Sequence, residues 1–295
     1  MSGETVHARS VTLRDWLALI RFSHTIFALP FALIALLCAT AGRPPLRVLG
    51  LCVLAMVAAR TAAMAYNRFA DRELDGRNPR TRGREIPRGV ISPPAALALA
   101  LGAGAVFVLA AALLAPLCGW LALPVLAVLF GYSHAKRFTA LCHLWLGVAL
   151  GLAPPAAWLA GRGELDTSIV ASLILGLGVS LWVAGFDVLY ACQDVDFDRG
   201  EGLFSLPVRL GPARALGVAR IAHAFAVLCF AGFGFLAGLG IVWHLGLALA
   251  ALLLFLEHRV VRADDLSRIN LAFFTLNGAV GIAMLAAVIF DLWLS

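Results

Sequence analysis

The stretch SIVASLILGLGVSLWVAGFDVLYA, residues 168–191, contains a single charged side chain, Asp187, near its end. A helix needs about 20 mostly apolar residues to span the hydrocarbon core of a membrane. The stretch is long enough for such a helix and has no alternation of polar and apolar residues, which the strands of a membrane β-barrel would show. It therefore predicts a transmembrane helix that brings one carboxylate to its far end.

The composition extends this prediction to the whole chain. Of the 295 residues, 62% are hydrophobic and 14% are charged, against roughly 45–50% and about 25% in soluble domains. The mean hydropathy is +0.92. These values exclude a disordered chain and leave no reason to predict a nucleic-acid-binding protein. They predict an all-α, polytopic membrane protein.

Nine apolar stretches are long enough to predict nine transmembrane helices in one domain over residues 1–295. Their expected ranges are 16–41, 46–70, 93–115, 117–134, 139–160, 168–191, 213–236, 238–257 and 270–291. Acidic segments at the ends of the second and sixth stretches suggest two repeated halves, about 16–134 and 139–291. The six cysteines are scattered without a CxxC pair, which favours small buried side chains over a disulfide or zinc site.

Basic residues predict the orientation, because short cytoplasmic loops are enriched in Arg and Lys. With the N-terminus inside, the inner loops are 71–92, 135–138, 192–212 and 258–269. They hold most of the basic loop residues, whereas the outer loops and their edges carry chiefly Arg43, Arg47 and Arg162. The bias predicts a cytoplasmic N-terminus and an external C-terminus.

The first acidic segment combines an amide and two carboxylates at helical spacing. Asn67, Asp71 and Asp75 follow one another at intervals of four residues, which places them on one face of a helix. The segment ends the second stretch, at its cytoplasmic side.

The second acidic segment ends the sixth stretch on the same side. Asp187, Asp194 and Asp198 are spaced i, i+7 and i+11, again on one helical face, whereas Asp196 falls on another face. Carboxylates near membrane depth repel one another and need compensation. Mg²⁺ prefers carboxylate oxygens together with substrate phosphates, so two such faces are suited to a diphosphate bridged by Mg²⁺.

Two alternatives compete with this interpretation. The acidic segments could be solvated helix ends with local ion pairs, or intramembrane acids of a cation or proton pathway. A transporter would place its acids near the midplane on broken helices, whereas these cluster at the inner ends.

Arg72, Lys136 and Arg137 are the expected partners of the diphosphate. Most of the basic residues over 77–88 are assigned to membrane topology or loop structure.

The two motifs resemble those of the UbiA superfamily of intramembrane prenyltransferases. Further resemblance lies in His24–Pro30, in Arg80-Thr81-x-x-Arg84, and in Ser205-Leu206-Pro207. The stretch from Tyr190 to Gly211 is most similar to the bacterial 4-hydroxybenzoate polyprenyltransferase branch, including related enzymes of menaquinone pathways. The residues around Asn270 and Asn277 resemble the family's last helix.

The resemblance implies nine helices around a central cavity with its active site on the cytoplasmic side of the bacterial inner membrane. It also implies an Mg²⁺-dependent transfer of a prenyl group from a polyprenyl diphosphate to an aromatic ring, with two ions. The ring would be 4-hydroxybenzoate or a related precursor of ubiquinone or menaquinone. The expected metal ligands are Asn67, Asp71, Asp75, Asp187, Asp194 and Asp198.

The implied mechanism assigns roles to further residues. Asp71, Asp75, Asp194 and Asp198 are the expected catalytic carboxylates. Arg72, Lys136 and Arg137 would stabilise the leaving diphosphate, Tyr132 would shield an allylic cation, and His24 would contact the acid group of the acceptor. Other reactions of the superfamily stay open, namely haem farnesylation, chlorophyll-type synthesis and formation of archaeal-type lipid ethers.

Overall fold

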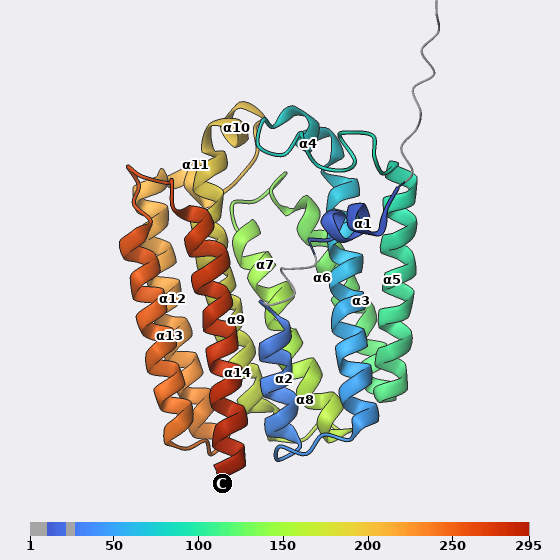
Figure 1. Cartoon of the computed structure of the whole chain (residues 1–295), viewed down its shortest axis with the longest axis vertical. Helices are drawn as coiled ribbons and strands as arrows, with labels where there is room; N and C mark the ends of the chain where they lie inside the picture. Colours follow the sequence, from blue (N-terminus) through green and yellow to red (C-terminus); the bar gives the residue numbers. More distant parts are fainter. Residues whose placement is uncertain (1–10, 22–26, 295) are drawn as a thin grey trace, which may run out of the picture.

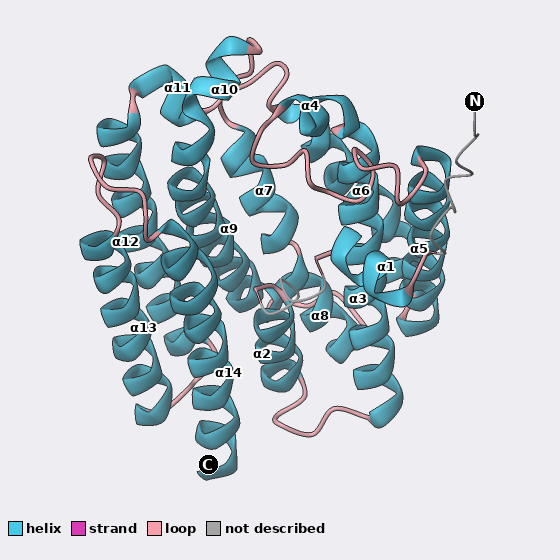
Figure 2. Ribbon diagram, turned by 45° about the horizontal axis from the view of Figure 1, so that its top comes forward, coloured by secondary structure: helices cyan, strands magenta, loops and turns pink. Residues whose placement is uncertain are grey.

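The computed structural model describes residues 11–21 and 27–294, and these residues form a bundle of helices joined by short loops (Figures 1 and 2). The bounds of the first half are α1 Leu13–Leu19, α2 Leu29–Ala39, α3 Leu46–Ala70, α4 Arg72–Arg77, α5 Pro93–Leu114, α6 Pro116–Ala135, α7 Cys142–Gly151 and α8 Ala153–Arg162. Those of the second half are α9 Ile169–Ala191, the 3₁₀ turn η2 Cys192–Asp194, α10 Val195–Gly200, α11 Leu206–Leu210, α12 Pro212–Leu236, α13 Ile241–Val260, the π-helical turn η3 Leu271–Leu276 and α14 Asn277–Leu294.

Eight helical stretches of the described chain are long and apolar enough to cross a membrane. They are Leu46–Ala70, Pro93–Leu114, Pro116–Ala135, Cys142–Arg162, Ile169–Gly200, Pro212–Leu236, Ile241–Val260 and Leu271–Leu294. The prediction of an all-α membrane protein is therefore confirmed, and each of these stretches overlaps a predicted span. The ninth predicted span, 16–41, is not one continuous helix.

The first span is divided into α1 and α2. The α1 helix ends before Arg21, whose φ of 45° lies in the left-handed region. The α2 helix starts at Leu29, and Pro30 occupies its first turn, where the missing N–H costs nothing. With 11 residues, α2 reaches only about 16 Å along its axis. The sequence prediction of one helix over 16–41 was wrong, because the described residues Ile20, Arg21, Phe27 and Ala28 between α1 and α2 are in turns.

A second interruption divides the predicted span 139–160 into α7 and α8. Pro154 and Pro155 follow the break in the first turn of α8, and a proline inside a helix removes a backbone donor and disrupts the turn before it. Close to this break, α7 packs against α9 through glycines. A Cβ atom on Gly151 would lie 2.5 Å from the carbonyl oxygen of Gly176, so only small residues permit this approach.

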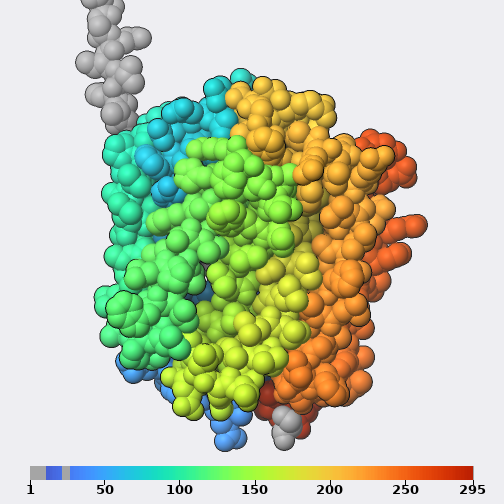
Figure 3. Space-filling model, turned by 180° about the vertical axis from the view of Figure 1, so that it is seen from behind, coloured from blue at the N-terminus to red at the C-terminus, as the bar shows by residue number. Residues whose placement is uncertain are grey.

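The arrangement of α3 and α9 determines where the acidic segments meet. Both helices rise toward the same end of the bundle, where they are continued by the short helices α4 and α10 (Figure 1). The α7 helix packs against α9, and α3 packs against α5. The opposite face of the bundle is covered by α6, α7 and α8 beside α9 and α12 (Figure 3). The two acidic segments therefore lie together above the interior of the bundle.

At the other end of the bundle, α13 begins against a carboxylate from α14. Asp291 accepts hydrogen bonds from the backbone N–H groups of Gly240, Val242 and Trp243 at 2.6, 3.1 and 3.2 Å. A helix leaves its first N–H groups without intrahelical partners, and a side-chain oxygen usually satisfies one or two of them. Asp291 therefore links the last helix to the start of the previous one.

We expect Asp291→Ala to lower the free energy of unfolding by about 1–2 kcal/mol, the usual range for loss of a helix cap. Asp291→Asn keeps an oxygen acceptor and is expected to lower the free energy of unfolding by less. Thermal unfolding of the detergent-solubilised variants measures the difference. Equal stability of the two variants would contradict a capping role.

Candidate active site

The first acidic wall is formed where α3 ends and α4 begins. Asp71 occupies the junction, with φ −94° and ψ 5°. The backbone bonds Asp71 N–H to Asn67 C=O (2.9 Å) and Asp75 N–H to Asp71 C=O (2.7 Å) continue the helical pattern across it. The three side chains therefore stay on one side and line a polar cavity, as their spacing predicted.

Both carboxylates of this wall are buried and paired with cations. Asp71, which is 4% exposed, binds Lys136 at 2.9 Å and Arg137 at 3.2 Å. Asp75, which is 5% exposed, binds Arg84 at 2.6 Å through Oδ1. Within the described chain, the buried Oδ2 of Asp75 has no hydrogen-bond partner. An oxygen in that state can accept a further ligand.

The second acidic wall comes from the end of α9, the η2 turn and α10. Asp187, Asp194 and Asp198 all line the same polar cavity as the first wall. Asp196 does not line this cavity. Its side chain is fully exposed and lies 3.9 Å from that of Arg199. The helix changes at Ala191 from α to 3₁₀ geometry and back again, yet the spacing keeps the three predicted carboxylates on one side.

The loop after α4 joins the two walls. Arg80 donates from Nε to Asp194 at 2.9 Å and from a terminal nitrogen to the hydroxyl of Tyr190 at 2.9 Å. Asn78 donates to the same carboxylate at 3.1 Å. Burial opposes the charge of Arg80, but the bonds to Asp194 outweigh it and raise the pKa of Arg80. The sequence analysis assigned most of this loop to topology, whereas Arg80 and Arg84 contact the acidic residues directly.

The other residues predicted for the site differ in whether they line the polar cavity. Tyr132 and Lys136 line the polar cavity. Arg137 reaches Asp71 from the surface, and Arg72 is turned away from the cavity, where it pairs with Glu73 at 3.3 Å and lies over the ring of Phe69. Arg72 is therefore in no position to hold a ligand of the cavity. His24 lies outside the described residues.

Several cavity residues were not singled out from the sequence. Arg21, Arg60 and Arg68 line the polar cavity, and Arg68 is buried with Asn67 as a hydrogen-bond partner. His143 bonds to Asp187 at 2.7 Å. The signal available in the sequence was the rarity of Arg and His within apolar helices.

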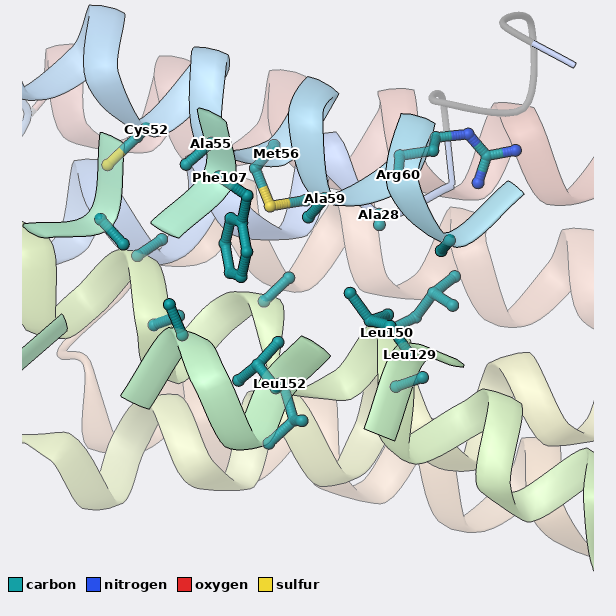
Figure 4. A pocket seen from close by; sticks show the side chains of 18 of the residues that line it. Ala28, Cys52, Ala55, Met56, Ala59, Arg60, Phe107, Leu129, Leu150 and Leu152 are labelled. Carbon is teal, nitrogen blue, oxygen red and sulfur yellow. The ribbon is translucent and has the colours of Figure 1, made fainter. Parts of the chain in front are cut away.

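An apolar cavity continues the polar one toward the opposite end of the bundle. Arg60, Met64, Asn67, Tyr132, Leu146 and Leu150 line both cavities. Below them, Ala59, Met56, Ala55 and Cys52 descend one face of α3 opposite Leu150 and Leu152 (Figure 4). From Asn67 to Cys52 this face extends about 22 Å at the helical rise per residue.

Aromatic side chains cover another side of the polar cavity. Phe27, Phe186, Tyr190 and Phe273 line it, and the ring of Phe273 lies 4.5 Å from that of Tyr190 and 5.2 Å from that of Phe186. Phe273 belongs to the π-helical turn η3, and such turns often occur at functional sites. The result is an apolar, electron-rich wall beside the carboxylates.

The carboxylates of the cavity suit a divalent cation that binds together with a phosphate-bearing ligand. Among residues 11–21 and 27–294, no three His, Cys, Asp or Glu side chains converge closely enough to hold a metal ion on their own. Mg²⁺ is normally held by one or two carboxylates plus substrate phosphates, not by a cage of protein ligands. The spread carboxylates and the unpartnered Oδ2 of Asp75 match binding by a few carboxylates together with substrate phosphates.

Comparison with known proteins identifies the family. The sequence model of the UbiA prenyltransferase family matches residues 28–279, which is most of the chain. The chain belongs to this family. It is an integral membrane enzyme of the aromatic prenyltransferase type, and the resemblance found in its motifs is confirmed.

Curated relatives and solved structures agree with this assignment. The 4-hydroxybenzoate octaprenyltransferase of Aromatoleum aromaticum is 33% identical over 87% of this chain and 86% of its own length. That of Alcanivorax borkumensis is also 33% identical, over 87% and 88%. The apo structure of a UbiA homolog from Aeropyrum pernix K1 superposes with a TM-score of 0.82, at 38% identity over 91% of this chain and 98% of that one.

A more distant structure shares the fold. A UbiA homolog from Archaeoglobus fulgidus, bound to GPP and Mg²⁺, has a TM-score of 0.70 at 22% identity, covering 94% of this chain and 99% of that one.

Proposed function

We propose that this member of the UbiA family transfers a polyprenyl group from a polyprenyl diphosphate to 4-hydroxybenzoate or a related quinone precursor, with Mg²⁺, and releases diphosphate. The observation that carries the proposal is the junction of two facing aspartate walls with a deep apolar cavity. Such a site can hold a molecule with a multiply charged head and a long hydrocarbon tail. The names of the curated relatives support the choice of acceptor.

The diphosphate would lie between the two acidic walls. Asn67, Asp71, Asp75, Asp194 and Asp198 would hold two Mg²⁺ ions with it. Asp187, which was also expected to be a metal ligand, is bound by His143 and is left out of this set. Bound there, the metal supplies Lewis-acid stabilisation of the oxygen that leaves with the diphosphate. Arg80, Arg84 and Lys136 line the same cavity, and their positive charges suit phosphate oxygens.

The prenyl tail would occupy the apolar cavity. Below Arg60, the α3 residues that line it are Cys52, Ala55, Met56 and Ala59, and burial of hydrocarbon there is favourable by about 25 cal/mol per Å². The aromatic residues near the junction would exclude water from the allylic cation that forms when the C–O bond breaks. Their negative ring faces stabilise a nearby cation.

Arg60 is suited to bind the acid group of the acceptor. It lines both cavities, and its Nε is buried with no hydrogen-bond partner among the described residues. An unpaired buried donor is costly unless a ligand satisfies it. A carboxylate such as that of 4-hydroxybenzoate would provide the missing partner and place the ring between the two cavities.

The charge distribution supports a cytoplasmic active site. The loops on the side of the acidic walls carry Lys136, Arg77, Arg82, Arg88, Arg199, Arg209 and Arg262. Short loops rich in Arg and Lys face the cytoplasm in bacterial inner-membrane proteins. Both the polyprenyl diphosphate and the acceptor would then reach the enzyme from that side.

The proposal is tested with membranes that contain the protein, geranyl diphosphate, Mg²⁺ and radiolabelled 4-hydroxybenzoate. We expect label in a lipid-extractable product, and loss of that product when EDTA removes the metal. Restoration by excess Mg²⁺ is the control for EDTA itself. Product formation that is equal with and without EDTA would refute the metal requirement. Failure with a panel of aromatic acceptors would refute the proposed reaction.

A further inference from the structure

Prenyl transfer to an aromatic ring requires a proton acceptor, and this inference rests on the proposed function. When the ring attacks the allylic cation, the attacked carbon keeps its hydrogen and the ring loses its aromaticity. A base must remove that hydrogen as a proton. The base must lie at the depth of the ring, below the diphosphate, and must have a lone pair free to accept the proton.

Asp187 lies at that depth. It lies on α9, seven residues before Asp194 of the η2 turn, so it sits about 10 Å deeper in the bundle. Arg60 precedes Asn67 by the same interval on α3, and the two helices run in the same direction (Figure 1). Asp187 and Arg60 both line the polar cavity from separate helices. A ring whose acid group binds Arg60 would therefore lie near Asp187.

The partner of Asp187 differs from those of the other paired carboxylates. Asp71, Asp75 and Asp194 each form an ion pair with Arg or Lys. Asp187 is bound instead by Nδ1 of His143 at 2.7 Å, and within the described chain no Arg or Lys lies within ion-pair distance of it. Its charge is thus not cancelled by a permanent cation.

The tautomer of His143 follows from its second contact. The backbone N–H of Leu206 donates to Nε2 of His143 at 3.3 Å, so Nε2 offers a lone pair and the ring proton resides on Nδ1. That proton is donated to Asp187. In the tautomer assigned from this contact, the imidazole is uncharged and the carboxylate keeps its negative charge. His143 itself is only 3% exposed, so its orientation is fixed by packing as well.

We propose that Asp187 is the general base that takes the ring proton, and that His143 is the residue that positions it. The C–O bond of the prenyl diphosphate breaks, and its electron pair leaves with the diphosphate. An electron pair of the ring forms the new C–C bond. The C–H bond at the attacked carbon then breaks, its electrons restore the aromatic ring, and the proton passes to the carboxylate of Asp187.

The test compares wild type with Asp187→Asn, using geranyl diphosphate, Mg²⁺ and 4-hydroxybenzoate with or without deuterium beside the hydroxyl group. Single-turnover rates are measured. We expect the variant to lose about 100-fold or more in product formation, the usual contribution of a general base. A primary isotope effect, absent from wild type, should appear, since proton removal has become the slow step. Binding of geranyl diphosphate should be unchanged.

A second variant and a control keep the test decisive. His143→Gln is expected to lower kcat and leave the KM of both substrates unchanged, with a smaller isotope effect. Asp196→Asn alters an exposed aspartate of α10 outside the cavity and should behave as wild type. The inference is overturned if Asp187→Asn abolishes binding of geranyl diphosphate, as a metal ligand would, or if its loss of rate comes without an isotope effect. Absence of product from wild type would refute the proposed function instead.

Discussion

Asp71→Asn is expected to lower kcat for prenyl transfer by about 100-fold or more, because a metal that stabilises developing charge contributes several kcal/mol and each 1.36 kcal/mol is a factor of ten. Asp71 pairs with two cations, Lys136 and Arg137. Its replacement removes a proposed metal ligand and leaves two cations facing each other. The measurement is the initial rate with saturating Mg²⁺ and geranyl diphosphate.

Asp196→Asn is the matched control, because it neutralises an aspartate of the other acidic segment that is fully exposed. It is expected to retain the wild-type rate. A higher Mg²⁺ requirement in Asp71→Asn, with partial recovery at high metal concentration, would identify the defect as one of metal binding. Near wild-type activity of Asp71→Asn would refute the assignment of Asp71.

The second large effect concerns the length of the prenyl chain. Ala55 lines the apolar cavity from α3, twelve residues below Asn67, or about 18 Å along the helix. We expect Ala55→Phe to block the deep part of the cavity. Transfer from geranyl diphosphate should persist, whereas transfer from octaprenyl diphosphate should fall at least tenfold, since several isoprene units would have no apolar space.

The readout is the ratio of the two rates, which a general loss of folding would not change. Leu54→Phe adds the same ring on the neighbouring residue, whose side chain is exposed on the surface of the bundle, and should leave the ratio unchanged. Undiminished transfer from octaprenyl diphosphate by Ala55→Phe would mean that the tail does not occupy this cavity.

The transmembrane helices were predictable because length and apolar character suffice to define them. The predicted range 46–70 coincides with α3, and the prolines at the starts of α5 and α12 lie where the helices begin. Hydropathy could not reveal the interruption of the fifth span, since the residues there are as apolar as their neighbours, whereas the first span carries the polar residues Arg21, Ser23, His24 and Thr25 between its two helices. Pro30, Pro154 and Pro155 were the available signals.

The acidic walls were predictable for a similar reason. Helical spacing alone placed Asp71 and Asp75 on one side, and the small changes of geometry at Asp71 and at η2 preserved that side. The contacts of Arg80, Arg84 and His143 were not predictable, because they depend on how a loop folds back and on how α7 packs against α9. The two repeated halves stay a prediction, although both acidic walls follow the same order of long helix, short interruption and short helix.

The pairing of Asp71, Asp75 and Asp194 with fixed cations has a consequence for the resting protein. Each of these carboxylates already has a counter-charge of its own within the fold. The folded chain therefore has no need of a resident divalent ion to relieve repulsion among them. Under the proposed function, what needs the ion is the negative charge that each new substrate brings, and on its arrival Lys136, Arg80 and Arg84 would move from their aspartates to phosphate. The site would then exchange one set of ionic partners for another in every turnover.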